Sequence, residues 1–200
     1  QLAMGQPAAR GDFYHLYING QYWGLFNTCE RPEASFAATY FGGTEEDYDT
    51  LKARAGAAGF MGGGGGGPSE MPFATDGDTA AWKRLYAAAK AGLSSDAAYQ
   101  KLLGNNPDGT RNPDFEVLLD PANLIDYMLV IIYGGNLDSP VSKFGSNAMP
   151  NNWFGSRSRK GGQGFRFFVW DAEHTLLDIH EDRTGPFTGG AQYPQSNPQW

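Results

Sequence analysis

Three polar side chains stand at the ends of strongly apolar stretches. Asp138 follows an apolar helical run and a glycine pair, Asn152 opens an aromatic stretch, and Asp171 closes another. Carboxylate and amide oxygens are the ligands that hard cations such as Mg²⁺ prefer. Phosphoryl transfer uses such a set, with one Asp to orient a hydroxyl and an Asn and an Asp to hold metal on a nucleotide. The pattern therefore predicts Asp138 as a catalytic residue, and Asn152 and Asp171 as metal ligands.

Two of these residues also have a structural interpretation. Asp138 lies in a glycine-rich, turn-like stretch, where an Asp often caps its own loop. Asp171 could cap the turn after its strand. A carboxylate at the end of a fully apolar strand is costly unless it is paired, however, and this cost favours a functional role for Asp171.

Lys52 and Glu30 are candidates for cofactor binding. Lys52 ends a short predicted strand and could contact phosphate, pair with Glu30 or Glu33, or remain solvated. Glu30 precedes a predicted helix and could instead favour that helix's N-terminal dipole. His174 is the histidine nearest to this chemistry, and a hydrogen-bonded wall role is favoured for it over metal binding or acid–base work.

Bulk composition narrows the classes of partner. The chain has 200 residues, 40% of them hydrophobic, and a net charge of -7. An acidic chain is a poor match for nucleic-acid backbones or anionic membranes, and suits a basic protein substrate or a metal-bound nucleotide. Cys29 is the only cysteine, so there is no internal disulfide. The cysteine count is therefore compatible with a location in the cytosol or outside the cell. No apolar run reaches membrane-span length.

Local patterns predict an α+β protein. Asn19-Gly20 between two aromatic runs predicts a β-hairpin, because a type I′ turn needs positive φ at both central residues. A helix is expected over Glu33–Tyr40 and a strand over Tyr48–Lys52. Residues 54–72 contain six consecutive glycines and predict a flexible insertion. They are not a Walker A loop, because no Lys-Ser/Thr follows.

The second half is predicted to hold three helices and two strands. Thr79 and Ser94 or Ser95 begin two helices, and Asp120-Pro121 begins a central helix that is expected to be buried nearly all round. Its predicted buried stripe is Leu124, Ile125, Met128, Leu129 and Ile132. Asn152–Phe154 is expected to form a short strand, Ser156–Gly164 a turn, and Phe165–Trp170 a strand central in its sheet. The aromatic residues predicted to lie in the core are Trp23, Phe26, Trp153, Phe167 and Trp170.

Several of these pieces together resemble one family. Leu16-Tyr17-Ile18-Asn19-Gly20-Gln21-Tyr22-Trp23-Gly24-Leu25-Phe26, followed by Glu30, is similar to the hairpin signature of the bacterial CotH kinases, the spore coat protein H-like atypical kinases. Further matching pieces follow in the family's order: Tyr40-Phe41-Gly42, the strand ending at Lys52, Gly135-Asn136-Leu137-Asp138-Ser139, Asn152-Trp153-Phe154 and Trp170-Asp171. The resemblance covers most of residues 14–176 and skips the glycine-rich insertion.

The resemblance implies an atypical protein-kinase-like fold and transfer of phosphate from ATP to protein serines with Mg²⁺ or Mn²⁺. By this match Asp138 is the catalytic-loop Asp, Asn152 the loop's metal ligand and Asp171 the metal-binding Asp. Family members place the Asn a few residues after the Asp, whereas residues 139–151 intervene here, so Asn147 and Asn151 rival Asn152. The family's phosphate-contacting basic residue is expected upstream of residue 1.

The expected organisation is a single, partial kinase-like domain over residues 1–200, cut from a longer protein at both ends. A basic, serine-rich protein is the expected substrate. Two other interpretations stay open. One is a non-catalytic pseudokinase-like module with a binding or coat-structural role. The other is a metal-dependent hydrolase using both aspartates, for which no base that activates water can be named.

Overall fold

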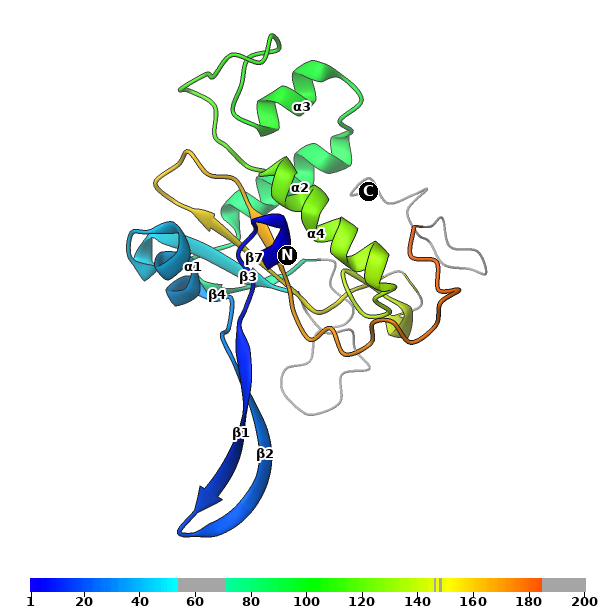
Figure 1. Ribbon diagram of the computed structural model, residues 1–200. Helices are drawn as coiled ribbons and strands as arrows, with labels where there is room; N and C mark the ends of the chain where they lie inside the picture. The colour runs from blue at the N-terminus through cyan, green and yellow to red at the C-terminus, as the bar shows by residue number, and fades with distance from the viewer. Residues whose placement is uncertain (54–70, 146, 148, 185–200) are drawn as a thin grey trace.

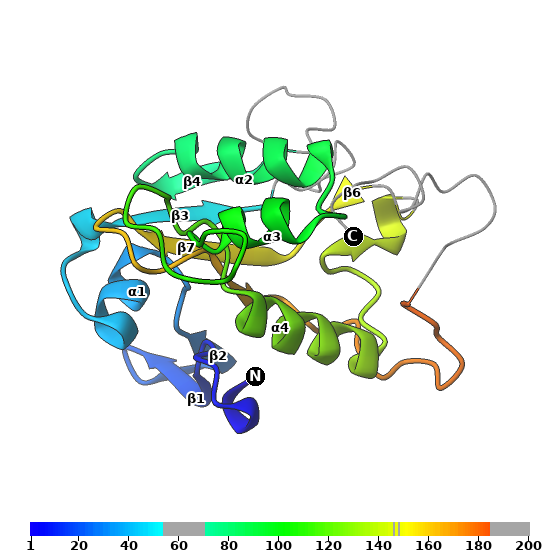
Figure 2. The ribbon, with the colours of Figure 1, turned by 90° about the horizontal axis from the view of Figure 1, so that it is seen from above.

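A four-stranded antiparallel sheet organises the computed structural model, which describes residues 1–53, 71–145, 147 and 149–184. The strand order is β4-β3-β7-β8. The strands are β3 (Tyr48–Lys52), β4 (Phe73–Asp76), β7 (Trp153–Ser158) and β8 (Arg166–Val169). Figures 1 and 2 show helices on both sides of this sheet. The mixture of helices with antiparallel strands confirms the predicted α+β class.

Alternation along β7 and β8 divides the core between the two faces of the sheet. Trp153 and Phe167 pack in one cluster with side chains of α2, α3 and α4, whereas Phe154 and Phe168 pack in another cluster with Phe36 of α1. The helices are α1 (Ala34–Phe41), α2 (Ala80–Ala91), α3 (Asp96–Leu102) and α4 (Pro121–Gly134). Packing on both faces explains why β8 is apolar from Phe167 to Val169, after the arginine that begins it.

Local capping signals set the ends of α4. The Asp120 side chain accepts a hydrogen bond from the backbone N of Asn123, Pro121 occupies the first turn, and Gly135 ends the helix with φ 58°. These features satisfy backbone groups that a helix end leaves free. Ser95 caps α3 in the same way, through the backbone N of Ala98. The predicted helix starts were therefore confirmed.

The predicted buried stripe of α4 is wrong by about one residue. The buried positions are Asn123, Tyr127 and Ile131, while the predicted Leu124 and Met128 are only partly buried. Exposed apolar side chains on this helix are Ile125, Leu129 and Tyr133. The physical reason is that Asn123 faces the sheet to bond its backbone, which turns the 123–127–131 row inward and leaves one side of the helix exposed.

The apolar stretch Phe165–Trp170 predicts a strand in the centre of its sheet, and this prediction is wrong. β8 lies at the edge of the sheet. Side-chain amides occupy the open backbone edge in place of a neighbouring strand. Asn123 Oδ1 accepts from the Phe167 N at 2.5 Å, and Gln1 bonds both the Phe167 O (3.0 Å) and the Val169 N (3.1 Å). A buried edge without such partners would leave costly unsatisfied groups.

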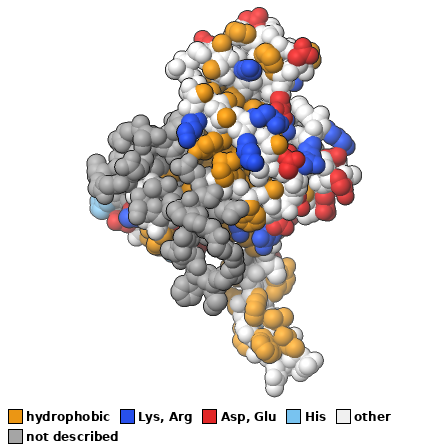
Figure 3. All heavy atoms as spheres, turned by 180° about the vertical axis from the view of Figure 1, so that it is seen from behind, with side chains coloured by type: hydrophobic (Ala, Val, Ile, Leu, Met, Phe, Trp, Pro, Cys, Tyr) orange, Lys and Arg blue, Asp and Glu red, His pale blue; other side chains and the backbone are white. Residues whose placement is uncertain are grey.

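The predicted hairpin is present as a projecting arm, formed by β1 (Gly11–Ile18) and β2 (Gln21–Cys29). Asn19 and Gly20 have φ of 51° and 79°, as the turn type requires. Figure 1 shows the arm extending from the body, and Figure 3 shows hydrophobic side chains along it. The core assignment of Trp23 and Phe26 is wrong, since they are 60% and 44% exposed. The two strands pair only with each other among the described residues, so nothing covers these rings.

Several smaller elements differ from prediction. β7 continues to Ser158 and shortens the predicted turn, and β4 was not foreseen because it follows the glycine-rich stretch. Residues 54–70 of the predicted insertion lie outside the described residues. The remaining short elements are η1 (Leu2–Met4), η2 (Glu45–Asp47), β5 (Val141–Ser142), η3 (Lys143–Gly145) and β6 (Met149–Pro150). Among the described residues, no helix is long and apolar enough to cross a membrane.

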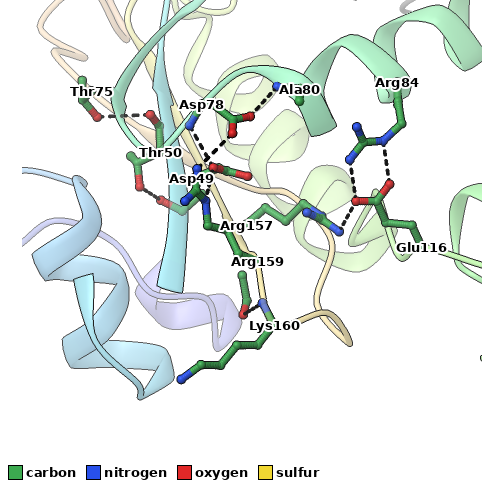
Figure 4. Close-up of polar contacts among 12 residues, drawn as sticks. Asp49, Thr50, Thr75, Asp78, Ala80, Arg84, Glu116, Arg157, Arg159 and Lys160 are labelled. Carbon is green, nitrogen blue, oxygen red and sulfur yellow. Dashed lines mark hydrogen bonds and ion pairs between the residues drawn. The ribbon is translucent and has the colours of Figure 1, made fainter. Parts of the chain in front are cut away.

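An ionic network joins the far end of β7 to the helical side of the sheet (Figure 4). Arg157 is buried and donates to Glu116 at 2.7 Å and to the Val117 O at 3.0 Å. Arg84 of α2 binds the same Glu116 through two hydrogen bonds of 2.7 Å. Glu116 thus neutralises a buried guanidinium and an exposed one together.

Candidate functional site

Strand register brings three of the predicted site residues to one end of the sheet. Lys52 pairs with Phe154, and Trp153 pairs with Val169. Asn152 directly precedes β7, and Asp171 follows β8 by two residues. Because neighbouring strands run antiparallel, the end of β3, the start of β7 and the end of β8 coincide. Lys52 and Asp171, more than a hundred positions apart, therefore lie at the same end of the sheet.

Asp138 lies in the loop after α4, and the residue is buried, with 8% exposure. It accepts hydrogen bonds from Asn151 Nδ2 at 3.1 Å to both oxygens and from Asn152 Nδ2 at 3.0 Å. Ser142 Oγ donates to Asp138 Oδ1, which also accepts from Asn151. Four donor contacts from three side chains hold the carboxylate in one orientation.

The backbone around Asp138 is tied to α4 and to the start of β7. Asn136 Oδ1 accepts from the Asp138 N at 2.9 Å. Ser139 Oγ donates to the Asn152 O at 2.7 Å and also bonds the buried Tyr127 hydroxyl at 2.9 Å. Burial raises the pKa of Tyr127 well above its ordinary value, so this phenol stays neutral. The loop is therefore anchored on both sides of Asp138.

Asn152 connects the two predicted aspartates. Its Nδ2 donates to Asp138 and lies 3.4 Å from the Asp171 backbone O. Asn152 and Asp171 both have positive φ, 47° and 52°, a conformation that Asn and Asp tolerate better than most residues. Of the rivals, Asn151 also bonds Asp138, whereas Asn147 bonds Arg183. Among the three candidate amides, Asn152 is the one that bonds both the Asp138 carboxylate and the Asp171 backbone.

Glu173 adds a carboxylate beside Asp171 that the sequence reading had missed. Glu173 and Asp171 are both exposed, so the expected cost of leaving Asp171 unpaired at the end of an apolar strand does not arise. A limited loss of hydration raises the pKa of Glu173, and a hydrogen bond and the negative charge from Asp171 raise it further. Two carboxyls in such contact disfavour both being ionised unless a cation lies near them. No group of three His, Cys, Asp or Glu side chains suited to a metal occurs in the described residues. A metal site here would rely on an amide oxygen as well.

Two cations, Lys52 and Arg31, lie near the Phe154 ring at this end of the sheet. Lys52 Nζ is 5.3 Å from the Phe154 ring centroid and 6.0 Å from that of Trp170, and the Arg31 guanidinium is 5.9 Å from the same Phe154 ring. Burial lowers the pKa of Lys52, and the nearby charge of Arg31 lowers it further, while Asp171 acts in the opposite direction. Arg31 is already ion-paired with Glu33 at 2.6 Å, and the charge of Glu33 also raises the pKa of Lys52, so Glu33 offsets part of this positive charge.

Glu30 does not join this group. Its carboxylate accepts hydrogen bonds from the Tyr40 hydroxyl at 2.9 and 3.0 Å and from the Arg10 N at 3.0 Å. The N-terminus of α1 is met instead by Asp76, which accepts from the Ala34 N at 3.2 Å. Glu30 thus ties the base of the arm to α1 and contacts neither Lys52 nor the aspartates.

His174 contacts neighbouring residues of the Asp138 loop and of its own segment. Its ring lies 4.9 Å from the Phe144 ring and its Nε2 lies 3.3 Å from Glu173. Its backbone O accepts from the Leu137 N at 3.1 Å. His174 therefore holds the Asp138 loop by its backbone.

Asn151, Ser142, Glu173 and Arg31 are the site residues that sequence reasoning left out or ranked second. Only Glu173 carried a usable signal, since it stands two residues after Asp171. The contacts of the others arise from pairing between distant segments.

The fold is an α+β arrangement with helices on both faces of an antiparallel sheet, and the Asp138 loop meets Asn152 and Asp171 near one end of that sheet. Residues 2–200 match the family model described as CotH kinase protein, so the chain belongs to the CotH kinase family. No curated protein matches the chain, and no solved structure does.

Proposed function

We propose that this protein transfers the γ-phosphoryl group of ATP to serine hydroxyls of a protein substrate, with Mg²⁺ or Mn²⁺. The observation that carries the proposal is the bridge made by Asn152 between the Asp138 carboxylate and the Asp171 backbone. It brings the residue suited to a hydroxyl within one side chain of the residues suited to a metal-bound phosphate.

Asp138 orients the acceptor hydroxyl and takes up its proton. An ionised carboxylate is an acceptor only. Asn151 Nδ2 contacts both of its oxygens, so one of these two contacts can give way to the incoming hydroxyl. The donors from Ser142, Asn151 and Asn152 set its direction, so no reorientation is needed when the hydroxyl arrives. Such preorganisation is the main contribution that a protein makes to phosphoryl transfer.

Asp171, Glu173 and the amide oxygen of Asn152 are the residues that fit a divalent cation. Together they offer an all-oxygen donor set, and a cation would offset the negative charge that Asp171 and Glu173 place beside each other. When bound, the ion supplies charge neutralisation at the phosphate oxygens. The chain's own contribution is to hold these oxygens at the strand ends.

Lys52 is proposed to contact the phosphates, together with Arg31, which would share its charge between Glu33 and the phosphates. Both cations lie near the Phe154 ring, and Asp171 is close enough to influence the charge of Lys52. A polyphosphate between these cations and Asp171 would find positive charge on one side and bound metal on the other. Because the chain's net charge is -7, we expect a basic, serine-rich protein as the acceptor.

The test is transfer of labelled phosphate from ATP to a basic, serine-rich protein, with ATP affinity measured in parallel. Asp138→Asn is expected to keep ATP affinity within a few-fold while the rate falls by roughly 100-fold or more. Asp171→Asn is expected to lose affinity and rate together. Asp114→Asn, at an exposed position away from these strand ends, is the matched control.

Two results would contradict the assignment. Equal ATP affinity with and without divalent metal would remove the metal role of Asp171. Metal-dependent ATP binding without any transfer by the parent protein would favour the non-catalytic, pseudokinase-like alternative.

A further inference from the structure

The segment that follows Asp171 runs back across the loop that carries Asp138. Residues 172–184 are here called the strap, and Figures 1 and 2 show them beside the C-terminal end of α4. The Leu176 N donates to the Gly134 O at 2.8 Å, and the His174 O accepts from Leu137. The strap therefore begins at one predicted site aspartate and packs against the loop of the other.

Arg183 near the end of the strap is buried, with 6% exposure. Its guanidinium donates to the Val141 O at 2.5 Å, to Asn147 Oδ1 at 3.0 Å and to Glu181 at 3.2 Å. A buried guanidinium is costly to desolvate, and its fork of donors is here matched to acceptors on two segments. This is a built contact rather than a chance surface pair.

Glu181 completes the contact between strap and loop. Its carboxylate also accepts from Lys143 Nζ at 2.7 Å. A Cβ added at Gly135 would meet the Glu181 side chain at 3.6 Å, so this glycine, which ends α4, lies directly under the strap. The strap thus contacts the Asp138 loop both before and after Asp138.

The path from Arg183 to the proposed base is short. Val141, which Arg183 holds through its carbonyl, is followed by Ser142, and Ser142 Oγ donates to Asp138. Asn147 N in turn donates to the Ser142 O at 2.8 Å. Both loop acceptors of Arg183 therefore adjoin or bond the residue that orients Asp138.

We propose that Arg183 is a positioning residue: it holds Val141 and Asn147 so that Ser142 keeps the Asp138 carboxylate in its working orientation. The proposal rests on the proposed phosphotransfer for its kinetic readout, and on the strap contacts alone for its structural readout. It makes the strap a coupling element between the metal side and the hydroxyl side of the site.

The experiment compares Arg183→Met and Arg183→Lys in the full chain, with Arg84→Gln as the control. Arg84 also binds a glutamate through two hydrogen bonds, but in the network of Figure 4, away from the strap. Arg183→Met is expected to slow transfer by about 10-fold or more while ATP affinity changes by about 2-fold or less. Arg183→Lys should recover part of the rate, since it keeps the charge but not the fork.

Amide hydrogen exchange of residues 137–145 supplies a readout that needs no activity. It is expected to accelerate about 10-fold in Arg183→Met, and to stay unchanged in Arg84→Gln. Ser142→Ala approaches the same path from its other end, so its rate loss and that of Arg183→Met should be clearly less than multiplicative in the double variant.

Unchanged exchange over residues 137–145, or equal effects of the Arg183 and Arg84 variants, would overturn the proposal. Fully multiplicative rate losses with Ser142→Ala would do so as well. If the parent transfers no phosphate, the proposed function fails by itself, and the exchange experiment alone decides whether Arg183 holds the loop.

Discussion

Asn152 and Asp138, fourteen positions apart, are joined by a hydrogen bond of 3.0 Å from Asn152 Nδ2 to Asp138 Oδ2. The bond connects the start of β7 to the loop after α4. Asn152 adopts φ 47° to make it, a conformation that costs most non-glycine residues about 1 kcal/mol. The site therefore depends on a residue whose side chain and backbone are both specialised.

Substituting Asn152 by Gly and by Ala separates these two contributions. Both variants lose the amide that orients Asp138, and both should slow transfer by roughly 10- to 100-fold. Asn152→Ala should also be less stable than Asn152→Gly by about 1 kcal/mol, because alanine is strained at positive φ. Transfer assays and urea unfolding measure the two effects. Equal rates for the parent and both variants would exclude a role for the amide.

Glu173 should make stability depend on pH. Its pKa is raised in the folded protein above the ordinary value of 4.5. The stabilisation from the protonated side chain is thus fully present below pH 4.5 and is lost as pH rises through the raised pKa. Glu173→Gln, which stays neutral, should gain stability relative to the parent as pH rises over this window.

Thermal unfolding from pH 4 to 7 without divalent metal tests this expectation, with Glu45→Gln as a control at another exposed glutamate. Adding Mg²⁺ at neutral pH should stabilise the parent more than Glu173→Gln. A pH profile of Glu173→Gln parallel to that of the parent would show that Glu173 and Asp171 are not coupled.

Glu116 should matter far more to stability than Arg84, although the two bind each other. Burial lowers the pKa of Arg157, and Glu116 offsets this cost most, with a smaller contribution from the charge of Asp49. Glu116→Gln leaves a buried guanidinium without its counter-charge and should cost about 3 kcal/mol. Arg84→Gln removes only an exposed partner and should cost about 1 kcal/mol or less. Urea unfolding of both variants gives the comparison, and similar losses would mean that Arg157 is neutralised in another way.

Replacing Trp153 by Ala should destabilise the protein far more than replacing Trp23 by Ala. Trp153 is 5% exposed and packs against Trp82 and Phe167, so Trp153→Ala should destabilise by about 3–5 kcal/mol. Trp23 stands on the projecting arm, and Trp23→Ala should change stability by about 0.5 kcal/mol or less. Equilibrium unfolding at low protein concentration measures both. A large loss for Trp23→Ala would show that the arm is covered in solution.

Local chemistry was readable from the sequence. Asn19-Gly20 determined the hairpin turn, and Asp120-Pro121 determined the start of α4, because each signal acts through its own backbone. Asp138 and Asp171 could be picked out for a related reason, since a carboxylate at the end of an apolar run is conspicuous without any partner. The family could be recognised because these short signals occur in a fixed order along the chain.

Tertiary structure decided whatever depends on the pairing of distant segments. Only the register of β3, β7 and β8 places Lys52, Asn152 and Asp171 at one end of the sheet. The face of α4 that packs on the sheet is likewise set by the hydrogen bond of Asn123 to the edge of β8. The periodicity of apolar residues does not reveal this bond. The exposure of side chains on the arm and the hydrogen bonds of Arg183 to the Asp138 loop also depend on how distant segments are placed. Burial and hydrogen bonding are properties of neighbours in space, and the sequence lists neighbours only along the chain.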